Sequence, residues 1–401
     1  MIVYISMLAI SILFAFLSTK SETKKDKMIF ATLATLPFIL VSSFRYNIGT
    51  DYLHRYLPNY LVFAHGRFID SLEPLFIVLI KMCVFFTKDY VALFVVTSII
   101  INVLVMWTIF KYSKNPIMSI IIFFIGSFYF QSLNLVRQYI AMVILFAGYY
   151  MLFQKKSKYL YIIMVGIATL FHSMSAVFLI VLFLEKKEIK AKYFLILIVL
   201  ILAVGGYLGN IADFIVTNTP LNEITNIAKY VKYFKMGGDL TLSTIIVETA
   251  VYIYIYMMFQ KLKEKNAVEK EAIFFVNMQT MTLLCTIMNI HFNLFFRIAL
   301  LFSIFQIISI PYFWFKNKDE NLKIFKFEKS VMTFTILILA VMTSRMMFSN
   351  VIKGADEVFP YVTIFYEKRI DDAVRKYTDY TIHPRRADSK RWTREFYIKH
   401  V

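Results

Sequence analysis

Cysteine, glycine and proline are scarce in this sequence. Only 2 of its 401 residues are cysteine, 11 are glycine and 8 are proline. Cys83 and Cys285 each lie in an apolar stretch without a second cysteine nearby, so we expect packing residues and no disulfide framework or redox motif. The sequence also has no internal repeat, no Gly/Ser linker and no glycine loop of the kind that binds phosphate. These absences leave a chain built from long regular elements.

Charged residues are few as well, at 17% of the chain, whereas apolar residues make up 59%. A soluble domain is about half apolar and about a quarter charged. The apolar residues form long runs, such as 91–110, 193–208 and 330–343, and about 20 helical residues cross a hydrocarbon core of about 30 Å. Composition therefore excludes the soluble, fibrous and disordered classes, and the lack of period-two alternation argues against a β-barrel. We predict an all-α, polytopic integral membrane helical bundle.

Acidic residues are in the minority, because 44 Lys+Arg against 26 Asp+Glu give a net charge of +18. In a membrane protein this excess first indicates topology, since lysine-rich loops stay in the cytoplasm, and we expect no nucleic-acid partner. The first apolar run has its lysines after it, which predicts an uncleaved helix with the N-terminus outside. Six lysine-rich segments are assigned to the inner side: 20–27, 111–114, 155–158, 186–192, 261–270 and 316–329.

This assignment predicts about 12 transmembrane passes, some of them short. The main helices are expected at 2–18, 28–43, 91–110, 116–133, 138–153, 193–208, 241–260, 271–290, 294–315 and 330–350. Residues 44–72 and 209–240 become outer loops of a membrane domain that spans 1–352. The basic tail 353–401 then falls outside.

Each pass must connect the two sides of the membrane, and this requirement leaves two further stretches that cannot be single passes. Residues 73–87 start and end on the outer side, so they are predicted to be re-entrant or to lie along the interface. Residues 159–184 join two inner segments, which requires two short arms with a turn near 171–173. Broken helices of this kind are tolerated where they line a polar cavity. The turn places His172 at the tip of a hairpin that faces the outer side.

Arginine is used differently from lysine in this chain. Of the 44 basic residues only 12 are arginines, and those before residue 353 fall in outer loops or near outer helix ends: Arg45, Arg55, Arg67, Arg137, Arg297 and Arg345. A guanidinium fork binds phosphate or carboxylate in bidentate geometry. Because arginine in a membrane segment costs about 2.5–3.5 kcal/mol on insertion scales, such residues are usually functional or paired.

We therefore predict that Arg137 and Arg297 bind an anionic ligand delivered by the bilayer, with Arg45 and Arg345 in support. A lipid-linked pyrophosphate is the obvious candidate. Ion pairs or interfacial snorkelling are the alternative, which we favour for Arg55 and Arg67.

Short polar motifs supply candidates for the chemistry. Gly49 permits a tight turn in 44–52, which leaves Asp51 to pair with Arg45 or to accept a proton. If the segment is helical, Asn134, Arg137 and Gln138 share one face and form a polar stripe. His172 is either a core histidine or a proton shuttle, which would accept the proton of a sugar hydroxyl or donate one to a phosphate oxygen. Glu248 is expected to neutralise an arginine, or else to act as a base. No His/Asp/Glu cluster has ligand spacing, so we predict no metal and no cofactor.

Together these segments resemble the EpsG family of bacterial exopolysaccharide membrane proteins, which are related in role to Wzy-type polymerases. The resemblance covers about 40–361, most of the chain, and the further residues 362–401 depart from the family pattern. It is carried by Arg45 with Gly49-Thr50-Asp51-Tyr52, Glu73-Pro74, Asn134 with Arg137-Gln138 and Ala141, His172 with Ser175-Ala176, Arg297, and Phe359-Pro360-Tyr361.

The resemblance implies a surface-polysaccharide polymerase, a glycosyltransferase of the bacterial cytoplasmic membrane. Such proteins transfer a growing glycan, of exopolysaccharide, capsule or O-antigen type, from undecaprenyl pyrophosphate to a hydroxyl of the next lipid-linked repeat unit at the outer face. The implied partners are the lipid-linked oligosaccharide, the bilayer, a chain-length co-polymerase and a flippase.

In that reaction His172, or next Asp51, is the candidate base. The leaving group is stabilised by the arginines, and Asn134, Gln138 and Tyr52 are further substrate-binding candidates. Three other functions compete with this one. A flippase or transporter would show inverted repeats, which the sequence lacks. A membrane acyltransferase takes its acyl donor from the cytoplasm, against the outward placement of Arg137 and His172. A non-catalytic scaffold leaves the placement of arginine unexplained.

Overall fold

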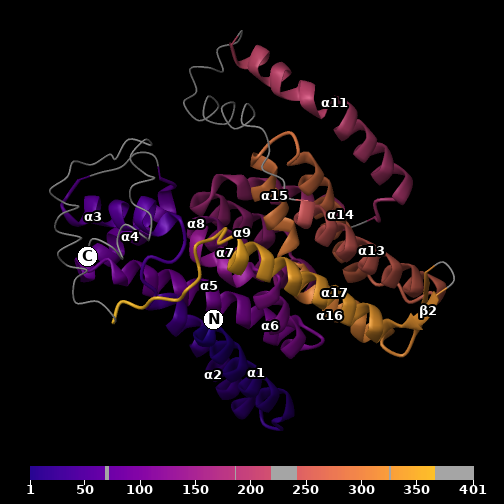
Figure 1. The fold of residues 1–401 in the computed structure, drawn as a ribbon, viewed down its shortest axis with the longest axis horizontal. Helices are drawn as coiled ribbons and strands as arrows, with labels where there is room; N and C mark the ends of the chain where they lie inside the picture. The colour runs from indigo at the N-terminus through magenta and orange to yellow at the C-terminus, as the bar shows by residue number, and fades with distance from the viewer. Residues whose placement is uncertain (68–71, 186, 218–241, 325–326, 366–401) are drawn as a thin grey trace. The chain divides into compact units, whose positions relative to one another are not determined.

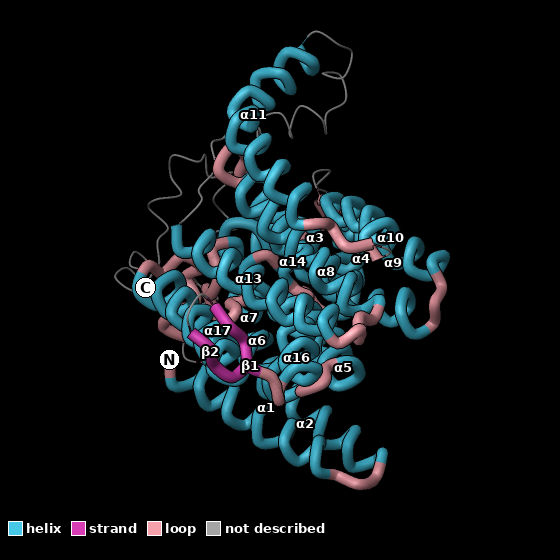
Figure 2. Tube along the Cα trace, turned by 90° about the vertical axis from the view of Figure 1, so that its right-hand side faces the viewer, coloured by secondary structure: helices cyan, strands magenta, loops and turns pink. Residues whose placement is uncertain are grey.

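The computed structural model describes residues 1–67, 72–185, 187–217, 242–324 and 327–365 (Figure 1). The described chain consists mainly of helices joined by loops, with one antiparallel hairpin of two short strands (Figure 2). Its strands are β1 (Asn321–Ile324) and β2 (Phe327–Ser330), with Asn321 opposite Ser330. The predicted all-α class is therefore confirmed. Residues 218–240 of the predicted outer loop and 366–401 of the predicted tail lie outside the described residues.

Among the described residues, seven helices are long and apolar enough to cross a membrane, or up to nine if each of two bent pairs is one span. The seven contain α1 (Ile2–Lys20), α2 (Lys24–Ser43), α5 (Val91–Tyr112), α8 (Val136–Tyr149), α13 (Leu242–Glu264), α14 (Lys270–Met288) and α17 (Val331–Met346). These lengths and compositions identify a multi-pass membrane protein. The count of about 12 passes stays a prediction.

Two predicted helices are interrupted in the structure. The first is divided into α6 (Pro116–Ile125) and α7 (Phe128–Asn134), where Ser127 has a left-handed φ of 65°. The second is divided into α15 (Leu294–Ser303) and α16 (Gln306–Asn317), which meet at 41°. No proline lies at either break, and the signal of the Gly126-Ser127 pair at the first one was missed in the sequence.

Several helices are too short to cross a bilayer without a partner. Residues 73–87 form α4 (Pro74–Phe86), whose 13 residues extend about 20 Å at 1.5 Å per residue. In the predicted hairpin, α9 (Lys158–Phe171) ends at the expected point and His172 is extended, with φ −156° and ψ 112°. The 3₁₀ segment Ser173–Ile180 and α10 (Val181–Leu184) follow. The predicted chain break at His172 is therefore present. The next helix, α11, spans Ala191–Thr217.

The chain folds into two compact units. Of the described residues, unit 1 contains those within 1–106, 127–140 and 347–365, and unit 2 contains those within 107–126 and 141–346. In unit 1, α1 and α2 lie side by side (Figure 1), and the Ser11 hydroxyl donates to the Ala34 carbonyl at 2.7 Å. Tyr4 of α1 fixes the C-terminal segment, because its hydroxyl donates to the Val358 carbonyl at 2.9 Å. Its ring also packs edge to face against Phe359 and Tyr361.

Unit 2 has an aromatic core in which α14, α16 and the second half of α8 meet. Phe274 packs edge to face against Phe305 with ring centroids 5.0 Å apart, and Phe275 stacks on Tyr149 at 5.6 Å. The Ser119 hydroxyl of α6 donates to the Ile307 carbonyl at 2.6 Å. Buried aromatic pairs contribute about 0.5–1.5 kcal/mol each beyond their area, so this core fixes the helices that carry the polar groups described below.

Candidate functional site

The turn after α2 brings the chain against the end of α7. Gly49 has φ +93°, and a Cβ atom at this position would lie 2.8 Å from the Leu133 carbonyl oxygen. Only glycine permits both the positive φ and this close approach. The Tyr46 amide donates to the Val362 carbonyl at 2.9 Å, which holds the other side of the turn. The predicted tight turn at Gly49 therefore exists and lies between α7 and the C-terminal segment of unit 1.

Asn134 is the centre of a polar cluster in unit 1. Its side-chain oxygen accepts from the Thr50 hydroxyl at 2.8 Å and from the Asp51 amide at 3.0 Å. Its side-chain nitrogen donates to Asp356 at 3.4 Å, and its carbonyl accepts from the Tyr56 hydroxyl at 3.0 Å. One buried side chain thus joins three segments that are far apart in the sequence. We call Asn134, Asp51, Arg55, Tyr56, Glu73, Arg137 and Asp356 the Asn134 cluster.

The predicted polar stripe is not continuous. Asn134 ends α7, Leu135 leaves the helical region with φ −91° and ψ 48°, and α8 begins at Val136. Asn134 therefore does not share a helical face with Arg137 and Gln138, as we had expected. Gln138 is buried on α8. Arg137 is on the first turn of the same helix, where it keeps some exposure.

Arg45 is buried, with 1% of its surface exposed. It donates to the Ser42 carbonyl and to the Leu133 carbonyl at 3.3 Å, and its guanidinium carbon lies 4.7 Å from the Phe94 ring centroid. Both carbonyls belong to helix C-termini, where backbone dipoles favour a cation. Burial lowers the pKa of Arg45 from its ordinary value. In the structure this guanidinium joins the ends of α2 and α7.

Tyr52, at the end of the same turn, is also enclosed by protein. It has no exposed surface, and its ring stacks on Phe94 with centroids 4.2 Å apart. Burial raises the pKa of Tyr52 well above its ordinary value, so the phenol stays neutral. Tyr52 and Arg45 therefore pack on the same phenylalanine ring, Phe94, beneath the turn at Gly49.

Two ion pairs line the Asn134 cluster. Arg137 Nη1 lies 2.5 Å from Glu73 Oε2, and the two side chains are 14% and 18% exposed. Arg55 Nε lies 3.1 Å from Asp51 Oδ1, with exposures of 45% and 21%. The partner of Asp51 is thus Arg55, so of the two alternatives for Asp51 the pair with Arg45 is wrong. Arg55 is four residues further along the π-helix Tyr52–Tyr56, where helical geometry brings the two side chains together.

Tyr56 links these two ion pairs. Burial and the charge of Asp51 raise its pKa, the guanidinium groups of Arg137 and Arg55 lower it, and the net pKa is about 12. Tyr56 is therefore a neutral hydrogen-bond donor at neutral pH and lies within the electrostatic range of both pairs. The amide of Asn134 and the hydroxyl of Tyr56 hold the cluster together, and the partly exposed guanidinium groups of Arg137 and Arg55 are the groups that can bind the negative charge of a ligand.

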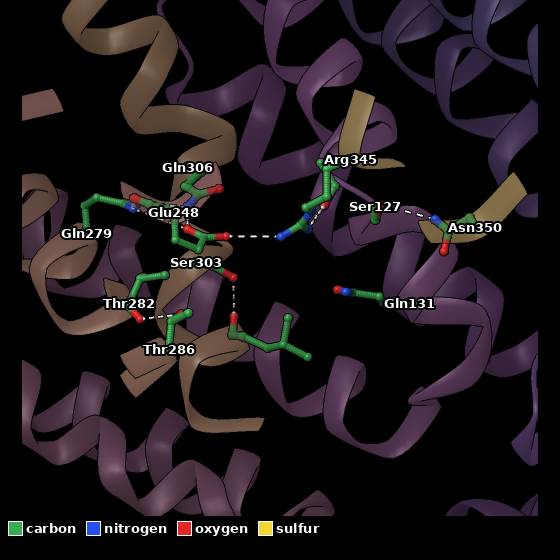
Figure 3. Close-up of polar contacts among 12 residues, drawn as sticks. Ser127, Gln131, Glu248, Gln279, Thr282, Thr286, Ser303, Gln306, Arg345 and Asn350 are labelled. Carbon is green, nitrogen blue, oxygen red and sulfur yellow. Dashed lines mark hydrogen bonds and ion pairs between the residues drawn. The ribbon is translucent and has the colours of Figure 1, made fainter. Parts of the chain in front are cut away.

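Unit 2 contains a second buried network, centred on Glu248 of α13 (Figure 3). Its Oε1 lies 3.4 Å from Arg345 Nη1. Its Oε2 accepts from Gln306 at 2.7 Å and from Gln279 at 3.3 Å. The other arginine nitrogen donates to the Gly126 carbonyl at 3.2 Å. The predicted ion pair between Glu248 and an arginine is confirmed, and Arg345 is the partner.

The remaining candidates also belong to unit 2. His172 is buried at the break between α9 and the 3₁₀ segment, and its carbonyl accepts from the Ser175 amide at 3.0 Å. Arg297 lies half-buried on α15. Unit 1 therefore brings together Arg45, Asp51, Tyr52, Asn134 and Arg137, with Gln138 on the same helix as Arg137, whereas His172, Arg297 and Arg345 lie in unit 2. In the described part of the chain, no group of three or more His, Cys, Asp or Glu side chains could hold a metal ion.

Sequence reasoning missed several polar partners. Glu73 was noted only as the residue before Pro74, and Tyr56 and Asp356 were not singled out. Gln279 and Gln306 were missed too, although an amide within a long apolar helix is itself a signal of an internal polar contact.

Comparison with known proteins identifies the family. The model of the EpsG family matches residues 28–363, a range that includes most of α2, the turn at Gly49, the Asn134 cluster, His172 and the Glu248 network. No curated protein and no solved structure matches the chain. The chain belongs to the EpsG family.

Proposed function

We propose that this protein is a polysaccharide polymerase that acts on lipid-linked repeat units. It transfers a growing glycan from undecaprenyl pyrophosphate to a hydroxyl of the incoming unit at the outer face of the bacterial cytoplasmic membrane. Membership of the EpsG family supports a polymerase of the glycosyltransferase class, and the apolar helices support a multi-pass membrane protein. The observation that carries the finer proposal is the accessible Arg137–Glu73 pair beside Asn134.

Arg137 has the properties of a phosphate-binding residue. It begins a helix of membrane-spanning length, it is partly exposed, and its guanidinium already binds a carboxylate. A phosphate offers the same planar fork two oxygen acceptors. When the bond between the sugar and the pyrophosphate breaks, negative charge develops on the phosphate oxygen, and a fixed guanidinium there stabilises the transition state.

The other candidates take roles that fit their surroundings. The carbon–oxygen bond to the pyrophosphate breaks with its electron pair on the phosphate, while the acceptor hydroxyl bonds to the sugar carbon and loses its proton to a base. His172 and Asp51 are the candidate bases. Arg45 supports the site by holding the end of α7, and Asn134, Gln138 and Tyr52 shape the same unit.

Arg297, Arg345 and His172 lie in unit 2, and their roles in charge support and proton transfer stay predictions from the sequence. The shorter helices α4, α9 and α10 add re-entrant or interfacial segments on the outer side, so that the passes number about 12. A chain-length co-polymerase and a flippase are the expected protein partners.

Incubation of purified protein with lipid-linked repeat units tests the function. We expect a ladder of longer saccharides together with released undecaprenyl pyrophosphate. Arg137→Lys keeps the charge but loses the fork, and we expect it to reduce the ladder by about 100-fold, the scale of one lost transition-state donor. Arg67→Lys is the matched control, because Arg67 is exposed, and it should retain full activity.

Each competing function gives a different result in this assay. A flippase produces no ladder, and an acyltransferase changes the saccharide mass by one acyl group. Full activity of Arg137→Lys would refute the role given to Arg137, even if the ladder itself forms.

A further inference from the structure

We propose that α4 lies flat in the interface of the bilayer and holds Arg137 at the level of the lipid phosphates. The partner of its exposed face is the headgroup region of an anionic lipid surface. The sequence left two alternatives for residues 73–87, a re-entrant segment or one along the interface, and the contacts within unit 1 favour the second. The placement of α4 is independent of the proposed function, and only its consequence for the substrate rests on that function.

The start of α4 is held at the start of a spanning helix. Glu73 directly precedes α4, and its Oε2 lies 2.5 Å from Nη1 of Arg137, which is in the first turn of α8. The guanidinium carbon of Arg137 also lies 5.9 Å from the ring centroid of Phe76, in the first turn of α4. The span Val136–Gln154 is long and apolar enough to cross a membrane. Its first turn, and with it the start of α4, therefore lies near one surface of the bilayer.

The other end of α4 is held at the start of a second spanning helix. The Tyr60 hydroxyl donates at 2.6 Å to the carbonyl of Thr87, the residue after α4. Residues 87–90 connect α4 to α5, and the Asp89 side chain accepts from the Val91 amide at 2.9 Å. Because α5 is also long and apolar enough to cross a membrane, the end of α4 lies near the bilayer surface at which α5 begins.

These two helix starts belong to the same surface of the bilayer. Arg45 contacts both, because its guanidinium carbon lies 4.7 Å from the Phe94 ring centroid in the first turn of α5 and its Nη2 donates at 3.3 Å to the Leu133 carbonyl, shortly before α8. One arginine side chain is too short to join opposite surfaces of a hydrocarbon core of about 30 Å. The 13 residues of α4 extend about 20 Å. With both ends at one surface, this helix runs along the surface and neither crosses the membrane nor turns back within it.

The exposed face of α4 fits such an interface. Four large apolar side chains lie on this face and are exposed: Val78, Met82, Phe85 and Phe86. The two phenylalanines are 84% and 80% exposed, and amphipathic helices bury such side chains about 5–10 Å into the boundary between headgroups and acyl chains. Lys81 and Lys88 are exposed on the same segment, where their charges match lipid phosphates and their stems can extend along the apolar surface.

This placement has a consequence for the substrate, which rests on the proposed function. The diphosphate of a lipid-linked unit lies at headgroup level, with its polyprenyl chain among the acyl chains. Because α4 holds Arg137 at the same level, the donor reaches the guanidinium while its lipid stays in the bilayer. Loss of the apolar face of α4 should therefore weaken capture of the donor and leave the chemical step unchanged.

Nitroxide labels on introduced cysteines measure the depth of α4 in the full chain, reconstituted in nanodiscs of phosphatidylcholine and phosphatidylglycerol. Val78→Cys and Phe86→Cys are labelled, while Cys83 and Cys285 are buried. Collision rates with oxygen and with a water-soluble nickel chelate give the depth of each label. Eight helical residues extend about 12 Å, so a helix that enters the membrane separates the two labels by about that depth. We expect equal depths, about 5–10 Å below the lipid phosphates.

Control labels calibrate the depth scale. Val103→Cys is on an exposed part of α5 near its middle and should report the centre of the bilayer. His65→Cys is on the exposed turn after α3 (Leu57–Ala64) and should report water. Met82→Cys adds a third label to the exposed face of α4 and should share the depth of the other two. Phe85→Cys takes the place of Phe86→Cys if that variant does not fold.

The ladder assay tests the consequence for the substrate. Replacing both Phe85 and Phe86 by glutamate should raise KM for the lipid-linked unit by about tenfold, the scale of exposing one buried phenylalanine, with kcat unchanged. Replacing both by leucine keeps the face apolar and should leave KM as it is. An unchanged KM for the glutamate variant would overturn the role of α4 in capture of the donor.

The depth measurement and the ladder fail separately. Labels at clearly different depths, labels in water, or labels shielded by a bound protein from both oxygen and nickel would each overturn the interfacial placement and leave the proposed function intact. If the wild type forms no ladder, the proposed function and the consequence for the substrate fail, while equal label depths still support the placement of α4.

Discussion

Replacing Glu248 by glutamine tests the buried network of unit 2. The two carboxylate oxygens have different partners: Oε1 contacts Arg345, and Oε2 accepts from Gln279 and Gln306. Glutamine has the same size and shape but only one acceptor oxygen. If its oxygen faces Arg345, its NH₂ group meets the two amide donors. If it is turned the other way, the NH₂ group meets the guanidinium.

The magnitude follows from these partners. Leaving a buried polar group without its partner costs about 1–3 kcal/mol, whereas polar contacts between membrane helices average about 0.6 kcal/mol and reach about 1.7. Arg345 keeps its hydrogen bond to the Gly126 carbonyl, so it is not left isolated. We therefore expect a loss of about 2 kcal/mol in the free energy of unfolding. At about 2–4 °C per kcal/mol for a domain of this size, Tm should fall by about 4–8 °C.

Thermal unfolding in detergent, followed by differential scanning fluorimetry, measures this change. The double variant Glu248→Gln with Gln306→Glu restores an acceptor opposite the new amide and leaves the glutamine carbonyl for Arg345. It should recover about half of the lost Tm, whereas Glu264→Gln on the exposed end of α13 should have no effect. An unchanged Tm for Glu248→Gln, or a double variant no more stable than the single one, would refute the hydrogen-bond argument.

Two further substitutions test the contacts of Gly49 and Arg45 with the end of α7. Gly49→Ala places a methyl group 2.8 Å from the Leu133 carbonyl oxygen at φ +93°, and the conformation alone costs about 1–2 kcal/mol, so Tm should fall. Gly66→Ala is the control, because φ is +74° there but the space around it is open. A fall in Tm no larger than that of the control would contradict the close contact between Gly49 and Leu133. Arg45→Lys cannot span both helix ends, so the free energy of unfolding in denaturant should fall by about 1.5–3 kcal/mol, and unchanged stability would contradict the bridging role.

The helices that the sequence predicted well are those with a lysine-rich end and an uninterrupted apolar run. The predicted 271–290 is Lys270–Met288, and the predicted 241–260 is Leu242–Glu264. Charge parity also located the break at His172. It could not find the left-handed Ser127 that separates α6 from α7, because that conformation is imposed by the packed structure and serine has no strong preference for it.

The candidate site was predictable in its residue types but not in its pairs. The motifs selected Asn134 and Arg137, yet Asp356, which accepts from Asn134, is 222 residues further along the chain. A single sequence contains no information on which distant segments meet. The pairing of Asp51 with Arg45 was a local guess, and it failed because Arg45 is directed at two helix C-termini while Arg55 lies on the same helical face as Asp51.

The contacts of the arginines before residue 353 explain why there are so few of them. A guanidinium in apolar surroundings needs an acceptor with matching geometry, and Arg345, Arg137 and Arg45 each have one: the carboxylate of Glu248, that of Glu73, and two helix C-termini. The difference between an internal counter-ion and a binding residue is therefore the accessibility of the acceptor. Glu73 is more exposed than Glu248, 18% against 7%, so a diphosphate can replace the first carboxylate at a much lower cost in desolvation than the second.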